Sequence, residues 1–134
     1  MNSILLRLLL LATVFAPMSL LAGQHDFKCV PTDVHTLNGE GILVPDEMFQ
    51  LRSKAFIVDR ESGRVTGGLL DNSGMTILLV DKGSSQQSFK TYAHTSSQVT
   101  HAMYLQINEF KPGSRKPFLA VRSPNSVVIT GICE

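Results

Sequence analysis

Two cysteines constrain the fold more than any other feature of this sequence. Cys29 and Cys133 are the chain's only thiols, and they lie near the two ends of the segment that follows a predicted export signal. An even number of cysteines in an oxidising compartment usually pairs. A bridge here closes a loop of roughly 100 residues, which in the chain-entropy model stabilises the fold by about 4.7 kcal/mol. We therefore predict a small domain whose termini are joined by a disulfide.

The first 22 residues have the composition of a cleavable signal peptide. Arg7 follows a short polar start, the apolar run from Leu8 to Phe15 comes next, and Leu20-Leu21-Ala22 ends in a small residue suited to cleavage. The apolar run is shorter than the roughly 20 residues that a membrane-spanning helix needs. We expect removal of residues 1–22, a single domain over residues 23–134, no stable membrane anchor, and a periplasmic or extracellular location.

The charge balance argues against polyanionic partners. The full chain has 12 basic and 11 acidic residues, and removal of the signal takes one basic residue, Arg7, with it. A formally neutral domain lacks the positive field that attracts nucleic acid or anionic lipid. We expect no nucleic-acid partner.

Strand patterns and turn residues dominate the rest of the chain. Turn signals recur at intervals of about 8 to 12 residues, which is typical of an all-β sandwich or barrel. We expect seven to eight antiparallel strands, beginning near Phe27 to Val30 and ending with Val127 to Cys133. The favoured architecture is a closed or nearly closed small barrel with the disulfide joining first and last strands at the seam, and a two-sheet sandwich is the alternative.

Five segments give four more specific predictions. Ala55 to Asp59 and Arg64 to Leu70 flank a glycine-containing turn and predict a hairpin. Met75 to Val80 is apolar on both faces, which favours a central strand. Val99 to Phe110 alternates, so that one side should face the core. Pro45-Asp46-Glu47 favours the start of a short helical turn.

A copper site is one candidate function. Cleavage after Ala22 would leave Gly23-Gln24-His25 at the amino terminus, which resembles the amino-terminal copper and nickel motif with histidine in third place. The α-amine, two backbone amides and the imidazole would supply the square-planar nitrogen set that copper(II) prefers. Possible copper binding is the only cofactor that the sequence suggests.

A second candidate metal site involves a histidine pair. His94 and His101 lie symmetrically about the expected turn Thr95 to Gln98. In a symmetric hairpin register the two imidazoles would lie opposite each other, with their Cβ atoms roughly 5 Å apart. Polar residues at a hairpin mouth are the alternative interpretation.

Two polar loops are candidate partner-binding sites. Lys111, Arg115 and Lys116 cluster in a Pro- and Gly-rich stretch, and Ser62 and Arg64 flank Gly63 in the expected hairpin turn. A solvated loop and ordinary turn chemistry are the favoured interpretations of these two patterns, and partner binding is the alternative.

The sequence does not contain the motifs of common catalytic sites. It has no His-Glu-x-x-His zinc motif, no phosphate-binding glycine loop, no calcium loop and no Gly-x-Ser-x-Gly element. We therefore expect a non-enzymatic domain that binds an unidentified protein or small ligand. A copper-binding protein and a barrel that carries a small ligand are the alternatives.

The plan of the chain resembles one known family. An export signal, Phe27-Lys28-Cys29 near the start and Cys133-Glu134 at the end match the layout of the small periplasmic inhibitors of animal-type lysozyme. The resemblance implies a β-barrel that inhibits a protein partner in the bacterial envelope. The family's inhibitory loop reads Ser-x-Ser-Gly-x-Lys/Arg followed by an aromatic residue. The nearest stretch, Glu61 to Val65, departs from it in the first serine, the spacing to the basic residue and the aromatic.

Overall fold

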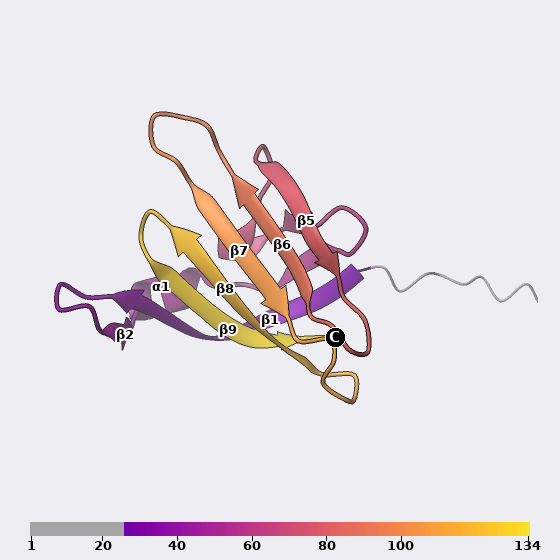
Figure 1. Cartoon of the computed structure of the whole chain (residues 1–134). Helices are drawn as coiled ribbons and strands as arrows, with labels where there is room; N and C mark the ends of the chain where they lie inside the picture. The colour runs from indigo at the N-terminus through magenta and orange to yellow at the C-terminus, as the bar shows by residue number, and fades with distance from the viewer. Residues whose placement is uncertain (1–25) are drawn as a thin grey trace, which may run out of the picture.

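The protein is a single antiparallel sheet that curls into a half-barrel (Figure 1). The computed structural model describes residues 26–134, so that the predicted signal peptide and the Gly23-Gln24-His25 motif lie outside the described residues. This part of the chain contains nine strands, one α-helix and one 3₁₀ turn. Their bounds are β1 Asp26–Leu37, β2 Leu43–Pro45, α1 Glu47–Arg52, β3 Phe56–Asp59, β4 Val65–Thr66, η1 Gly68–Leu70, β5 Thr76–Lys82, β6 Phe89–His94, β7 Ala102–Ile107, β8 Lys116–Ser123 and β9 Val127–Cys133.

Eight of the strands in the described range follow one another in the order β4-β3-β1-β9-β8-β7-β6-β5, and β2 pairs with β1 beside this path. The all-β prediction is confirmed, and the strands lie in one curled sheet rather than in two packed sheets. Strands β5 to β9 form a meander in which each strand pairs with the next. Strands β4 and β5 are therefore the two edge strands of the sheet.

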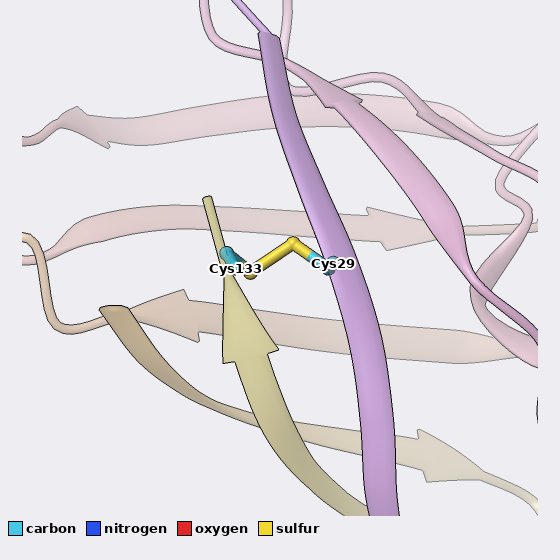
Figure 2. The surroundings of a disulfide bond; sticks show 2 residues. All are labelled: Cys29 and Cys133. Carbon is cyan, nitrogen blue, oxygen red and sulfur yellow. A yellow bond between two sulfur atoms is a disulfide. The ribbon is translucent and has the colours of Figure 1, made fainter. Parts of the chain in front are cut away.

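The predicted disulfide is present and joins the first strand to the last (Figure 2). Cys29 and Cys133 are directly opposite each other in the β1–β9 ladder, and both are fully buried. The prediction that the disulfide lies at the seam of a barrel is wrong, because β3 and β4 extend the sheet beyond β1. The bridge instead lies in the middle of the sheet.

The core fills the concave side of the sheet. Alternation along β7 buries Met103, Leu105 and Ile107, as the sequence predicted, although Val99 in the preceding loop is 56% exposed. Two edge-to-face aromatic pairs connect distant strands: Phe27 with Phe89, and Phe56 with Phe118. Such pairs add roughly 0.5–1.5 kcal/mol each to the free energy of area burial.

Strand β5 differs from its prediction. Its apolar residues on both faces indicated a central strand, but β5 ends the sheet and pairs only with β6. Ile77 and Leu79 pack against the core, whereas Leu78 and Val80 are 59% and 54% exposed on the outer side. The prediction of a strand with two apolar faces is confirmed, but its predicted central position is wrong.

The region from Asp33 to Pro45, indistinct in the sequence, extends β1 through a bulge and adds β2. The register of β1 against β9 shifts between Pro31 and Asp33, so that inward-facing positions change parity along one strand. The short helix α1 confirms the predicted helical turn. The Asp46 side chain accepts a hydrogen bond from Phe49 N at 2.9 Å and so caps the helix.

A buried asparagine connects the two ends of the sheet. Asn72 is fully buried between β4 and β5, and its Oδ1 accepts a hydrogen bond from Val65 N at 2.8 Å. Asn72 Nδ2 donates to the Gly63 carbonyl at 3.2 Å, and Thr91 Oγ1 on β6 donates to the same carbonyl at 3.2 Å. These bonds hold the β3–β4 hairpin against β6 where no ladder joins β4 to β5.

Asn72→Ala is expected to lower the free energy of unfolding by about 1–3 kcal/mol, because it leaves the buried Val65 N–H without its side-chain acceptor. Urea unfolding followed by circular dichroism measures this loss. Gln98→Ala, which removes an exposed side-chain amide from the β6–β7 loop, is the control and should change the midpoint little. Equal stabilities for Asn72→Ala and the wild type would contradict a structural role for the amide.

No helix within residues 26–134 has both the length and the hydropathy required to span a membrane.

Candidate functional site

Three loops of the described chain meet at one end of the half-barrel. The strand order places the β3–β4 turn, the β5–β6 loop over residues 83–88 and the β7–β8 loop over residues 108–115 at the same end of the sheet. Strand β1 begins and β9 finishes there (Figure 1). We call these three loops, together with Arg60 and Lys116, the loop end. Helix α1 and β2 lie at the opposite end.

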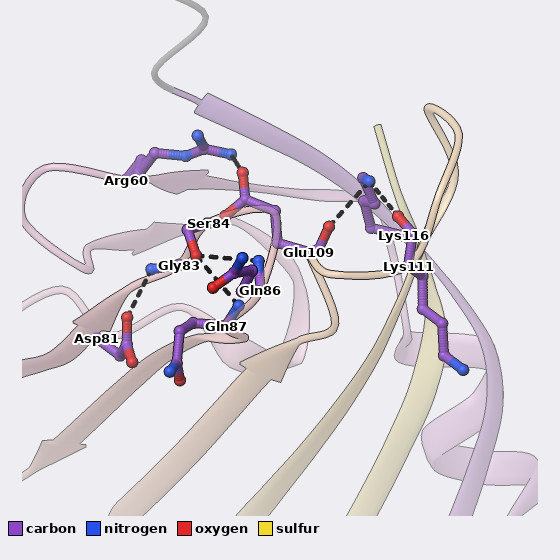
Figure 3. A network of polar contacts seen from close by, with 9 residues as sticks. All are labelled: Arg60, Asp81, Gly83, Ser84, Gln86, Gln87, Glu109, Lys111 and Lys116. Carbon is purple, nitrogen blue, oxygen red and sulfur yellow. Dashed lines mark hydrogen bonds and ion pairs between the residues drawn. The ribbon is translucent and has the colours of Figure 1, made fainter.

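An ion pair links two of these loops (Figure 3). Arg60 Nη2 in the β3–β4 turn lies 2.5 Å from Glu109 Oε1 in the β7–β8 loop. The Arg60 guanidinium also lies 4.3 Å from the centre of the Phe27 ring, a cation–π geometry. The Glu109 side chain is only 14% exposed. Because both charges are partly removed from water, this contact fixes the two loops more firmly than a fully exposed pair would.

A lysine holds the β7–β8 loop from within. Lys116 Nζ donates to the Glu109 carbonyl at 3.0 Å and to the Lys111 carbonyl, so that one ammonium group spans the loop (Figure 3). Lys111 Nζ lies 5.4 Å from the centre of the neighbouring Phe110 ring. Lys116 therefore stabilises the conformation of the β7–β8 loop. Lys111 and Arg115 are exposed and present their charges to solvent.

The β5–β6 loop is ordered by its own side chains. Asp81 Oδ1 accepts a hydrogen bond from Gly83 N at 2.8 Å. Ser84 Oγ accepts from the N–H groups of Gln86 and Gln87, each at 3.1 Å (Figure 3). Gly83 has a φ of +73°, and a Cβ there would lie 2.2 Å from Glu109 Oε2, so the glycine lets this loop approach the β7–β8 loop closely.

A recess of about 580 Å³ opens between the loop end and the termini of β1 and β9. It contains groups of both charges, and Arg60 Nε and Glu109 Oε2 are buried without a hydrogen-bond partner among the described residues. Fixed charges around a polar recess suit it to receive a charged or hydrogen-bonding group. Its lining residues are Asp26, Phe27, Arg60, Glu109, Gly113, Ser114, Lys116 and Glu134.

The predicted pair Ser62 and Arg64 lies in the β3–β4 turn, as expected. Ser62 Oγ donates to Asp59 Oδ2 at 2.7 Å and accepts from Arg64 N at 3.2 Å, which stabilises the turn. Both residues face a different recess, of about 490 Å³, that includes Asn72 and Met75. The pair therefore lies at the same end of the sheet as Lys111, Arg115 and Lys116, but it lines a different recess.

One acid beside that second recess has a clearly perturbed pKa. A hydrogen bond from the Ser73 side chain and others from the N–H groups of Gly67 and Ser73 lower the pKa of Asp71 from 3.8 to about 2. The N–H contacts measure 2.8 Å and 2.9 Å. Asp71 is exposed, and its hydrogen bonds order the connection between β4 and β5.

The register expected for the two histidines is wrong. His94 lies opposite Ala102, and Thr95 N bonds to the His101 carbonyl, so the hairpin is offset by one residue. Alternation along the strands then directs His94 and His101 toward opposite faces. His94 stacks on Tyr92 at 5.7 Å between ring centres. No group of three or more His, Cys, Asp or Glu side chains within residues 26–134 is placed to hold a metal ion.

Sequence reasoning missed the residues that organise the loop end: Arg60, Ser84 and Glu109. Arg60 and Glu109 are separated by 49 residues, and no motif signals their contact. The one available indication was Asp81-Lys82-Gly83, because an aspartate two residues before a glycine is typical of a tight turn. Comparisons of this chain with protein-family models, with curated proteins and with solved structures find no match.

Proposed function

We propose that this chain is an exported, non-enzymatic binding domain that holds a protein partner in the bacterial envelope through its loop end, as an inhibitor does. One observation carries the proposal: Arg60, Glu109 and Lys116 tie loops from different hairpins into one ordered surface beside a recess. Export rests on the signal-like residues 1–22, and the Cys29–Cys133 disulfide is consistent with it.

Loop order supports a binding role. Ordering flexible side chains and loops at an interface costs roughly 0.5–1.5 kcal/mol for each immobilised side chain, and a surface that is ordered before binding avoids part of that cost. In the β5–β6 loop, Ser84 Oγ accepts two N–H groups, and in the β7–β8 loop Lys116 bonds two carbonyls. The disulfide lies in the same half of the sheet and ties β1 to β9 beneath these loops.

The charges indicate the chemistry of the partner. Lys111 and Arg115 are exposed on the β7–β8 loop, and Gly113 and Ser114 of the same loop line the recess. Charged groups at the rim of an interface mainly steer association toward a surface of opposite sign. We therefore propose a partner with acidic groups around its binding surface, and a polar side chain or loop of that partner would enter the recess.

The double variant Lys111→Glu/Arg115→Glu is expected to weaken binding of the partner by at least about tenfold, mainly by slowing association. The partner is first isolated from the native envelope on immobilised wild-type protein and then purified. Association and dissociation rates for each variant are measured by biolayer interferometry at low and high salt.

The matched control reverses the same amount of charge at the other end of the sheet. Arg52 and Lys54 are exposed beside α1, so Arg52→Glu/Lys54→Glu changes net charge equally. The control should bind like the wild type, because these residues lie far from the loop end. Equal weakening by both double variants would show a net-charge effect and contradict a localised binding surface.

A further inference from the structure

Strand β5 has an unpaired edge although its residues are apolar on both faces. It pairs with β6 on one side, and within residues 26–134 no strand is paired with its other side. Leu78 and Val80 are 59% and 54% exposed there. Exposed apolar edge strands are templates for pairing with another chain, and proteins commonly shield them with charge or a helix. The β3–β4 turn approaches the inner side of β5, where a Cβ at Gly63 would lie 3.3 Å from Ile77 Cγ2, but the outward side chains of Leu78 and Val80 remain exposed.

An apolar row on the outer face of the sheet runs up to this edge and stops at it. The registers place one outward residue of each strand in line from β5 to β9. Directly paired residues of neighbouring strands lie on the same face. The row consists of Leu78, Tyr92, Tyr104, Val121 and Val128.

The sequence of β5 is complementary to itself when two copies run antiparallel about Leu78. Leu78 then faces Leu78 of the second copy on the outer face, Ile77 faces Leu79 on the inner face, and Thr76 faces Val80. Every pair is apolar or neutral, and outward residues stay on the outer side. A symmetric contact of this kind closes on itself at two copies.

The charged end of β5 lies outside this pairing. Lys82 Nζ is 2.6 Å from Glu61 Oε2, and Asp81 lies 4.0 Å from Lys90 Nζ, so each charge has a partner within its own copy. Val80 is the bulge residue and has no register partner on β6, so the regular part of the strand ends there. Both features limit pairing to the segment from Thr76 to Val80 and disfavour longer, misregistered contacts.

We propose that a second copy of this chain pairs with β5 along residues 76–80, which joins the two sheets and makes the two outer apolar rows continuous. The proposal commits to a homodimer because the segment matches itself about Leu78 and because the row would otherwise end at an open edge. It is independent of the proposed loop-end binding, since the loop end comprises other residues.

Leu78→Lys is expected to raise the dimer dissociation constant by at least about tenfold, because it places two like charges opposite each other on the symmetry axis. Sedimentation equilibrium over a wide concentration range measures the constant, and thermal unfolding checks the fold. Leu119→Lys is the control: Leu119 is 41% exposed on the same outer face but lies on β8, away from the edge.

A cysteine variant tests the register itself. Leu78→Cys should form a covalent dimer on mild oxidation, since directly opposite strand positions are within disulfide reach. Val121→Cys, in the same apolar row but on β8, should remain uncrosslinked. A wild type that is monomeric at every concentration overturns the proposal. So does a dimer that is dissociated by Leu119→Lys and not by Leu78→Lys, or crosslinking through Val121→Cys alone.

Discussion

Replacing both cysteines with alanine is expected to lower the free energy of unfolding by about 2–5 kcal/mol. The Cys29–Cys133 bridge spans 104 positions, so its loss frees almost the whole described chain in the unfolded state. Single domains are stable by only about 5–15 kcal/mol, and the loss is therefore a large fraction of the total. Urea unfolding of the wild type and of Cys29→Ala/Cys133→Ala measures the difference.

A reductant provides the control for this prediction. Dithiothreitol should shift the unfolding midpoint of the wild type toward that of the double variant and leave the variant itself unchanged. The two sulfurs are fully buried, so the alanines also remove packed atoms, and the reductant arm separates the cross-link from that packing. A wild-type midpoint that does not respond to full reduction would contradict a stabilising bridge.

Gly131→Ala is expected to destabilise the fold by about 3 kcal/mol or more, at or above the upper end of ordinary overpacking. A Cβ at Gly131 would lie 2.2 Å from the Val30 carbonyl oxygen, 2.8 Å from Pro31 Cα and 2.7 Å from the Phe118 ring. Two of these neighbours are backbone atoms of β1 beside its bulge, and they cannot move without disturbing the β1–β9 ladder.

The matched control for this change is Gly39→Ala in the loop before β2. Nothing lies within 4 Å of a Cβ at Gly39, and its φ lies outside the left-handed region. Such a change alters stability by a few tenths of a kcal/mol up to a gain of about 1 kcal/mol. Chemical unfolding of both variants compares them directly. Equal stabilities would show that β1 adapts to the added methyl group, against the close contact described.

The sequence predicted the fold where the signal was local or covalent. Alternation identified the core face of β7, Asp46 marked the start of α1, and Gly63 marked the hairpin turn. Two cysteines at the ends were enough to place β1 beside β9. These features depend on neighbours along the chain or on one strong cross-link, so a single sequence contains them.

Predictions that depended on long-range register failed. The pattern of β5 shows that both its faces are apolar, but it does not show how many strands lie beside it. The His94 and His101 prediction failed because the hairpin is offset by one residue, which reverses the face of a side chain. The bulge near Pro31 likewise shifts the register by one residue, and it thereby changes which positions of β1 face the core.

The candidate site could be predicted only in part. Lys111, Arg115 and Lys116 were identified from their clustering in one loop, and they do lie at the loop end. Their partners could not be identified, because Arg60 meets Glu109 only when two hairpins are brought together by the curl of the sheet.

The central claim is that the loop end is the surface that contacts a protein partner, and site-specific photocrosslinking in cells tests it most directly. A photoreactive residue is placed at Gln86 in the β5–β6 loop or at Leu51 on α1, both exposed and at opposite ends of the sheet. Irradiation is followed by immunoblotting and mass spectrometry of any adduct. We predict one discrete protein adduct from Gln86 and none from Leu51, whereas an adduct from Leu51 alone would contradict the account.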